Sequence, residues 1–371
     1  MIPRFVARCG RVFEELTVRP IALYGSAMLR IGYGLAYLLF LVREFPNREG
    51  LWGPNAAWTP ALERQYVDAS NWYGWIKSWY ALLATTSETR FELSYALALL
   101  ICAATVLGWH ARATSVAFML VVTTFTGRDV FLGDGGDNVL LLMSIYLVFT
   151  ACGRRLSLDS RRLAARTTEP RALSNPALVE LSEVRRRVVT LTHNAAILVI
   201  GFQMCVIYGA AALWKAQGPV WENGTALYYI LHIDWFRVWP ALSDSAADHP
   251  TIIAIIAYVT VFAQIGFPFA VFSKRLKYAL LVLLLGMHLS IAVFLGIPVF
   301  SAVMIIGDSV FLPDTFWLAA ERIARQTASR MRTRRSPSPQ PPSYPSAVPS
   351  DEHDGAATAW LEVAGADAHR Q

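Results

Sequence analysis

The sequence contains few charged residues. Only 16% of its 371 residues are Asp, Glu, Lys or Arg, whereas 55% are hydrophobic. A soluble domain usually carries about 25% charged residues, so this composition points to lipid as the solvent. Several apolar stretches approach the roughly 20 residues that a helix needs to cross a bilayer. We therefore expect an all-α polytopic membrane protein.

Several motifs that define enzyme classes are absent. There is no CxxC pair, and none of the four cysteines (Cys9, Cys102, Cys152 and Cys205) lies in a large loop where a structural disulfide is expected. No partner accompanies His288 at metal-ligand spacing, so we expect no structural metal. The sequence has neither a phosphate-binding glycine loop nor a Gly-x-Ser-x-Gly elbow. Its basic N-terminus lacks the apolar core of a cleaved signal peptide.

The apolar stretches that are present predict about eight spans. They cover residues 21–42, 93–109, 113–125, 139–152, 188–215, 251–272, 278–293 and 300–312. The fourth and eighth are short, which leaves the exact count open. Residues 1–20 form a basic arm, residues 21–320 form the predicted transmembrane domain, and residues 326–371 are predicted to be a disordered Ser/Pro-rich tail.

The positive charge is concentrated in a few segments. The net charge of +6 is carried by the N-terminal arm, the turn at Arg112, residues 153–187, residues 273–277 and the C-terminal tail. Cytoplasmic loops are rich in Lys and Arg, so we predict that these segments and both termini are cytoplasmic. The aromatic connection 45–90, the loop before residue 139 and the loop after Lys215 then face outward. We expect no nucleic-acid partner.

The stretch from Gly201 to Trp235 contains an apolar helix that ends in a lone lysine, Lys215. An ammonium group at the end of a hydrophobic span either extends to the membrane interface or is held in a polar pocket. A partly buried lysine beside Trp214, with Tyr208 about two turns earlier, could serve as a base or a Schiff-base nucleophile. Position alone favours the interfacial interpretation.

Other polar residues lie inside or beside the predicted spans. Inside them are Arg30, Gln264, His288 and Asp308. Because ionisable groups in a membrane usually pair with one another, we expect Arg30 to pair with Asp308 or with Asp137. A single histidine such as His288 is typically a hydrogen-bonded interior residue.

Two aspartates, Asp134 and Asp137, flank Gly-Gly immediately before an apolar helix. Such a pattern is typical of a turn that leads into a helix N-cap. We therefore expect at least one of the two side chains to cap this helix.

These motifs together resemble one membrane-protein family. The residues Tyr208, Lys215 and Trp221-x-x-Gly224-Thr-Ala are similar to the signature of the HTTM (horizontally transferred transmembrane) family, which is related to the vitamin K-dependent gamma-carboxylases. Further matches are Leu29-Arg30-Ile-Gly32, Asp134-Gly-Gly-Asp137-Asn138 and Cys152-Gly-Arg-Arg-Leu-Ser157-Leu-Asp159. The resemblance covers about residues 15–320.

The resemblance implies a role for Lys215. In the carboxylases the matching lysine is the base that starts the oxygenation of vitamin K hydroquinone, which drives proton abstraction from glutamate and addition of CO2. This sequence lacks the histidine that the carboxylases carry near Asp137-Asn138, and it lacks their large lumenal domain. Glutamate carboxylation itself is therefore not expected.

Two functions remain as alternatives. One is a multi-pass cell-membrane enzyme that acts on a lipid-soluble molecule, with a reduced quinone as its cofactor or substrate, or on an exported peptide. Its catalytic groups would be Lys215 and His288. Its substrate-binding groups would be Trp221, Gly224, Arg30, Asp134 and Asp137. The other function is a non-catalytic binding module, a transporter-like protein or a scaffold in the same bilayer.

Overall fold

The computed structural model describes residues 14–70, 74, 77, 79, 83–128, 131–166 and 175–335. Within these ranges every regular element is a helix, which confirms the all-α class. The chain divides into two units, residues 1–321 and residues 322–371. All the sites discussed below lie in the first unit. The described part of the second unit is the C-terminal portion of α17 (Asp314–Arg335).

Five helical segments are long and apolar enough to cross a membrane. They are Leu23–Trp52, which contains α2 (Leu23–Glu44), η1 (Phe45–Asn47) and α3 (Arg48–Trp52), then α6 (Glu88–Leu107), α10 (Pro176–Ala216), α14 (Pro250–Ala270) and α15 (Lys274–Phe294). The helical segments Pro298–Phe311 and Asp314–Thr327 are together also long and apolar enough to cross a membrane. The chain bends by 112° between them, so they form a broken span or a re-entrant loop. Length and composition thus give five or six spans within the described ranges.

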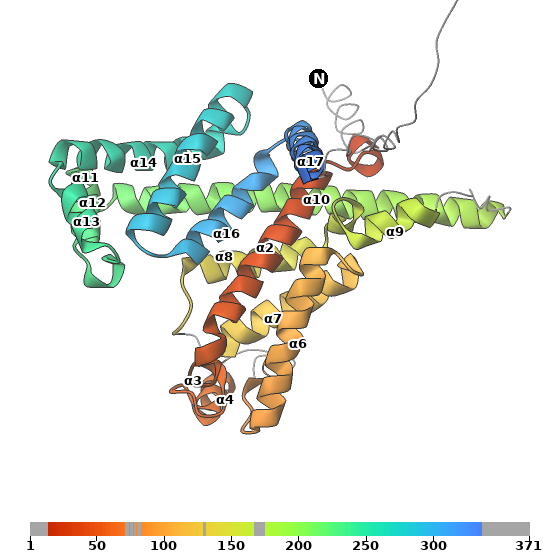
Figure 1. The fold of residues 1–371 in the computed structure, drawn as a ribbon, viewed down its shortest axis with the longest axis horizontal. Coiled ribbons are helices and arrows are strands. Elements are labelled where there is room, and N and C mark those ends of the chain that lie inside the picture. Colours follow the sequence, from red (N-terminus) through yellow and green to blue (C-terminus); the bar gives the residue numbers. More distant parts are fainter. Residues whose placement is uncertain are drawn as a thin grey trace, which may run out of the picture. The chain divides into compact units, whose positions relative to one another are not determined.

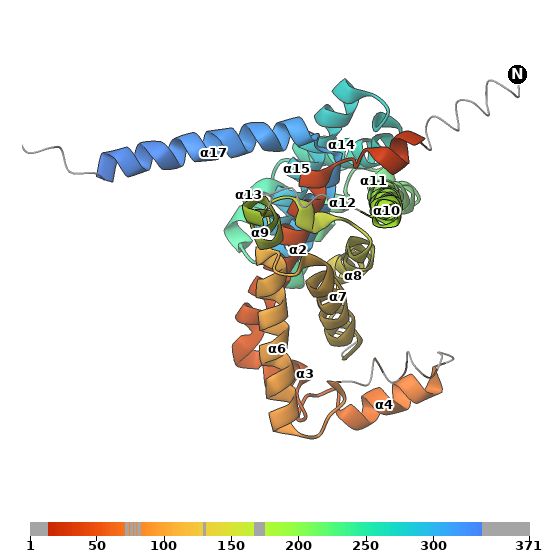
Figure 2. The ribbon, with the colours of Figure 1, turned by 90° about the vertical axis from the view of Figure 1, so that its right-hand side faces the viewer.

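Two of the eight predicted spans are not among these five or six segments. α7 (Ala111–Arg128) carries Arg112 near one end and Arg128 at the other, which lowers its mean hydropathy. α8 (Gly135–Val148) is apolar but has only 14 residues. Both helices pack inside the first unit, where α7 contacts α6 and α8 (Figure 2). A short apolar stretch can be a buried core helix as well as a span.

Helix α2 occupies a central place in the first unit, because it packs against α6, α8 and α16 (Pro298–Asp308) (Figure 1). Its buried stripe includes Leu29, Tyr33, Tyr37 and Leu41, which recur every fourth residue and therefore share one face. The opposite side leaves Leu39 58% exposed. A helix that is apolar on both its buried and its open side is typical of a bundle in contact with lipid.

The remaining long helices form a consecutive series. α10 packs against α14, α14 against α15, and α15 against α16 (Figure 1).

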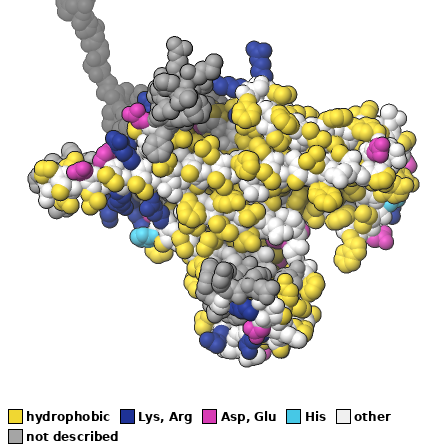
Figure 3. All heavy atoms as spheres, turned by 180° about the vertical axis from the view of Figure 1, so that it is seen from behind, with side chains coloured by type: hydrophobic (Ala, Val, Ile, Leu, Met, Phe, Trp, Pro, Cys, Tyr) yellow, Lys and Arg dark blue, Asp and Glu magenta, His cyan; other side chains and the backbone are white. Residues whose placement is uncertain are grey.

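Hydrophobic side chains cover most of the face drawn in Figure 3, and Lys and Arg gather at the end formed by α9 (Leu158–Arg166) and the start of α10. Large apolar surfaces mark protein or membrane contacts. The exposed apolar surface therefore supports association with a membrane.

The shorter helices lie between or beside the long ones. They are α4 (Pro60–Ala69), η3 (Cys152–Arg154), α11 (Pro219–Glu222), α12 (Ala226–Leu231), η4 (Asp234–Phe236), α13 (Pro240–Ala247) and η5 (Ser309–Phe311).

Residues 1–13 of the predicted arm and residues 336–371 of the predicted tail lie outside the described residues. α17 continues to Arg335, so residues 326–335 are helical where a disordered tail was predicted. This stretch contains Ala, Gln and Arg, which are good helix formers.

Candidate functional site

Lys215 lies in the last turn of α10 and is half-buried. Its Nζ donates a hydrogen bond to Gln264 Oε1 on α14 at 3.1 Å. The same nitrogen lies 5.4 Å from the ring centroid of Trp221, which belongs to α11. An ammonium over an indole ring is attracted by the negative face of the ring. The amine is therefore held between three elements.

Two turns earlier on α10, Tyr208 connects two buried ionisable side chains. Its hydroxyl donates to Asp308 Oδ2 on α16 at 2.7 Å and lies 3.1 Å from His288 Nε2 on α15. Tyr208, His288 and Asp308 are 1%, 2% and 8% exposed. A hydroxyl has one proton to donate. Because that proton goes to Asp308, His288 Nε2 must carry its own proton and donate it to Tyr208.

This assignment leaves the other imidazole nitrogen unoccupied. In neutral imidazole one nitrogen donates and the other accepts, so Nδ1 of His288 carries a lone pair. Nδ1 has no hydrogen-bond partner within the described part of the chain. An imidazole that is oriented through one nitrogen and free at the other has the arrangement of a general base.

Further buried polar atoms, on α2, on α16 and at the residue that follows α16, also lack partners among the described residues. They are Tyr33 Oη, Ser301 Oγ, Asp308 Oδ1 and Ser309 Oγ. A Cβ placed on Gly307 would lie 3.0 Å from Tyr33 Oη, which brings this tyrosine of α2 next to the end of α16. Buried polar groups are almost always satisfied, and each unpaired one costs about 1–3 kcal/mol. A polar ligand or water would satisfy these atoms.

The two groups of contacts are connected. Tyr208 and Lys215 are seven residues apart on α10, so they share one face of that helix. Gln264 Nε2 donates to Met287 Sδ at 3.4 Å, and Met287 precedes His288 on α15. We call the combined set the polar cluster. It comprises Tyr33, Tyr208, Lys215, Gln264, His288 and Asp308.

Trp221 and Gly224 shape the loop that follows Lys215. Gly224 has a φ of 71°, and a Cβ there would lie 3.0 Å from the Cβ of Ala254 on α14, so both the conformation and the close approach favour glycine. Tyr258 Oη of α14 donates to the carbonyl oxygen of Glu222 at 2.8 Å. These contacts fix the loop on α14 and hold Trp221 against the lysine.

Arg30 has a different role from the predicted one. It is fully buried, and its guanidinium donates to the backbone carbonyls of Thr105, Val106 (2.7 Å), Cys152 (3.4 Å) and Leu156 (2.6 Å). The predicted pairing of Arg30 with Asp308 or Asp137 is therefore wrong. The physical reason is that the last carbonyls of a helix, here α6, have no partner inside it. A guanidinium with five donors can serve several of them.

Asp134 and Asp137 cap α8. The Asp134 side chain accepts a hydrogen bond from the backbone N–H of Asp137 at 3.3 Å, and Asp137 Oδ2 accepts from the N–H of Asp134 at 2.8 Å. The prediction that at least one of the two aspartates caps this helix is confirmed. Gly135 lies against Phe300, whose ring centroid is 5.8 Å from that of His288. The capped end of α8 thus borders the polar cluster without donating a side chain to it.

The sequence analysis did not single out Tyr33, because tyrosine is common in spans. No spacing marked it, since Arg30, one turn earlier on α2, belongs to a different set of contacts. The buried ion pair between Arg128 and Glu63, whose Nε and Oε2 atoms are 3.2 Å apart, was missed as well. Arg128 also donates to the carbonyls of Trp52, Trp58 and Gly53, so it holds the aromatic connection in place.

Neither thiols nor a metal site contribute to the polar cluster as described. Cys102 and Cys152 are free and buried, Cys205 is free and half-buried, and Cys9 lies outside the described residues. No group of three or more His, Cys, Asp or Glu side chains within the described ranges is arranged to hold a metal ion. The hydroxyl, imidazole, carboxyl and amine groups that the cluster does contain can transfer protons and form hydrogen bonds.

No protein-family model matches the chain, and no solved structure matches it. The chain is similar to the uncharacterized protein YitO of Bacillus subtilis (strain 168), with 26% identity over 203 residues, which is 54% of this chain. The match spans 60% of the length of that relative. This similarity assigns no activity, so the function has to be argued from the polar cluster.

Proposed function

We propose that this protein is a multi-pass membrane enzyme that binds a lipid-soluble substrate at the polar cluster and removes a proton from it. The observation that carries the proposal is the buried Tyr208–Asp308–His288 group, in which His288 Nδ1 and Asp308 Oδ1 have no partner among the residues that the structure describes. Buried ionisable groups between apolar helices mark functional sites more often than stabilising ones. The cell membrane is then its location and the bilayer its surroundings.

Lys215 and His288 are the proposed catalytic groups. The resemblance to the HTTM family favours Lys215 as the base and a hydroquinone-type lipid as the substrate. In its neutral form the amine accepts the proton of the substrate hydroxyl, which yields an ammonium and a phenolate. Gln264 and Trp221 hold the amine in position, and both stabilise the ammonium once it forms. His288 Nδ1 can accept a hydrogen bond from the second hydroxyl.

The test compares lysine variants of the purified, reconstituted protein. Lys215→Ala should lower hydroquinone-dependent oxygen uptake by at least ~100-fold, because a positioned base contributes about 10²–10⁴ in rate. Lys277→Ala is the matched control, since Lys277 is also half-buried but lies at the start of α15 with its Nζ over the ring of Tyr278. Equal rates in the Lys215→Ala variant and the wild type would refute the assignment.

The second candidate is a non-catalytic binding module or transporter-like protein. The observation that favours it is the break between α16 and α17, because Asp308 ends α16 close to the 112° bend. Interrupted helices with polar groups near the break are typical of transporters. Saturable binding of a hydroquinone by wild-type protein without any turnover would favour this candidate over the enzyme.

A further inference from the structure

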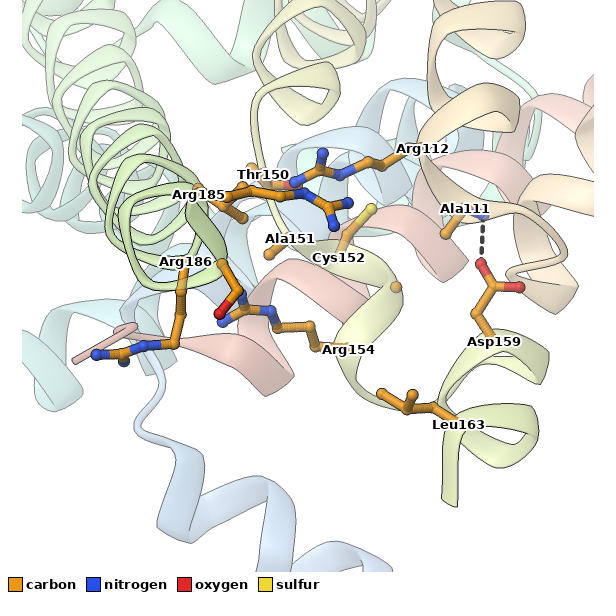
Figure 4. Close-up of a pocket in the computed structure, with 13 residues that line it drawn as sticks. Ala111, Arg112, Thr150, Ala151, Cys152, Arg154, Asp159, Leu163, Arg185 and Arg186 are labelled. Atoms are coloured by element: carbon orange, nitrogen blue, oxygen red, sulfur yellow. Dashed lines mark hydrogen bonds between the residues drawn. The ribbon is translucent and has the colours of Figure 1, made fainter. Parts of the chain in front are cut away.

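A second site lies among the arginines near the start of α10. A cavity of about 520 Å³ opens between the start of α7, the segment 150–154, α9 and α10 (Figure 4). Its charged lining comprises Arg112, Arg154, Arg185, Arg186 and Asp159. We call this cavity the arginine pocket. None of its residues belongs to the polar cluster.

Most of the positive charge in this pocket has no counter-ion among the described residues. The side chains of Arg112, Arg154 and Arg185 make no ion pair or hydrogen bond within the described ranges, whereas the Arg186 side chain pairs with Glu183 at 2.6 Å. Figure 4 shows the guanidinium groups of Arg112 and Arg185 directed toward each other above Cys152. Like charges that converge on one cavity repel each other unless an anion separates them.

The acidic side chain of the lining is already engaged. Asp159 accepts hydrogen bonds from the backbone N–H groups of His110 at 3.0 Å and Ala111 at 2.7 Å, the second of which is drawn in Figure 4. It therefore caps the start of α7 instead of neutralising the arginines. Partial burial and the positive charges of Arg112 and Arg186 lower the pKa of Arg154.

The floor of the pocket is fixed by buried contacts. Arg30 holds the carbonyl oxygens of Cys152 and Leu156, on either side of Arg154. A Cβ on Gly153 would lie 2.6 Å from the Cβ of Ala111, so the backbone at this glycine packs directly against α7. The position of Arg154 is therefore built into the fold, which lowers the entropy cost of binding a ligand there.

We infer that the arginine pocket binds a phosphate group. Arginine binds phosphate oxygens through paired N–H donors, and several arginines commonly surround one phosphate. The group could belong to the head of an anionic phospholipid or to a soluble phosphate compound. Leu163 and Val189 add apolar surface to the lining, and the pocket lies where apolar helices end. These features favour the lipid.

The experiment uses the full-length protein in detergent and two probes. The first probe is phosphatidic acid, compared with phosphatidylcholine by native mass spectrometry. The second is inorganic phosphate at constant ionic strength, measured as a shift in thermal unfolding. The test variant is the triple substitution R112Q/R154Q/R185Q. The matched control is R161Q/R166Q/R275Q, which removes three exposed arginines outside the lining.

We expect phosphatidic acid to bind the wild type and the control alike and to bind the test variant at least ~10-fold more weakly. Arginine-dependent binding of inorganic phosphate without lipid binding would also support the site and would identify the soluble source. Equal binding by test variant and control with both probes would overturn the inference.

A second variant keeps the test valid if the triple substitution does not fold. Ser182→Phe leaves every arginine in place and fills the cavity from α10, where Ser182 is exposed. It should weaken binding of the successful probe by a similar factor. Unchanged binding in this variant would mean that the ligand lies elsewhere on the basic surface, and the inference would fail.

Discussion

The hydroxyl of Tyr208 joins a carboxylate to an imidazole in the middle of an apolar bundle. The ring of Tyr208 also packs edge-on against Phe267, with centroids 5.3 Å apart. The ring and the hydroxyl of Tyr208 therefore have separate roles: the ring packs in the core, and the hydroxyl orients His288. This separation allows the hydroxyl to be removed without creating a large cavity.

Tyr208→Phe tests that hydroxyl. Asp308 Oδ2 and His288 Nε2 would lose their partner, so we expect the free energy of unfolding to fall by about 1–3 kcal/mol. Turnover should fall as well, because the imidazole is no longer oriented. Thermal unfolding in detergent and oxygen uptake provide the two measurements.

The control for this substitution is Tyr146→Phe. Tyr146 Oη donates to Gln203 Oε1 at 3.3 Å, outside the polar cluster, so its loss should leave turnover unchanged. If Tyr208→Phe matched this control in both measurements, Tyr208 would not orient the cluster.

At the scale of single residues, the sequence indicated which side chains belong to the polar cluster, but not which partners they bind. The polarity of Gln264, His288 and Asp308 in apolar stretches was enough to single them out, and the structure places all three in one cluster. The partners of Arg30 could not be predicted, because no residue type or spacing indicates which backbone carbonyls a side chain will bind. The interfacial position of Lys215 likewise gave no sign that Gln264 would reach it.

At the scale of elements, α6 depends on a residue from another helix. Its last carbonyls are bound by Arg30 of α2, so the charge is a C-terminal cap supplied through tertiary contact. The segment 152–156 depends on the same guanidinium. Arg30 thus joins α2, α6 and the floor of the arginine pocket.

Arg30→Met removes this cap while keeping a side chain of similar length. We expect the free energy of unfolding to fall by at least ~2 kcal/mol, because several buried carbonyls lose their donors. Arg43→Met is the control: Arg43 is exposed and paired with Glu44, and such pairs contribute about 0–1 kcal/mol. Denaturant unfolding in mixed micelles measures both variants. Equal midpoints would contradict the capping role.

Helix α10 shows why hydropathy alone misplaces element ends. The apolar run predicted a span from residue 188, but the helix begins at Pro176. Asn175 caps it by accepting from the N–H of Ala177 at 3.0 Å, and Glu183 pairs with Arg186 and Arg187 one turn later. Capping and i,i+4 ion pairs extend a helix into water, whereas hydropathy marks the part that lipid can surround.

At the scale of the whole molecule, α10 has a consequence for sidedness. Arg185 and Lys215 lie on this one helix about 45 Å apart, at 1.5 Å per residue. The hydrocarbon core of a bilayer is about 30 Å thick. If α10 crosses the membrane, the arginine pocket and Lys215 lie at opposite surfaces. Together with the distribution of Lys and Arg, this predicts a cytoplasmic arginine pocket and an outward Lys215.

Cysteine labelling in intact cells tests this orientation. Glu222→Cys, in the loop after Lys215, should react with a membrane-impermeant maleimide from outside. Glu180→Cys, near the start of α10, should react only after lysis; both glutamates are exposed. Unsubstituted protein corrects for the native thiols. The reverse pattern, or equal labelling of both positions in intact cells, would contradict the predicted topology.

Because α10 is a single uninterrupted helix, a tilt of the helix about its middle moves both of its ends. A tilt of about 5° would displace one end relative to the other by about 4 Å over this length, which exceeds the reach of a hydrogen bond. If α10 crosses the membrane, a ligand bound to Arg185 at one leaflet would therefore influence how closely Lys215 approaches α14 at the other. The lipid composition of the inner monolayer would then affect the contact between Lys215 and Gln264 near the outer one.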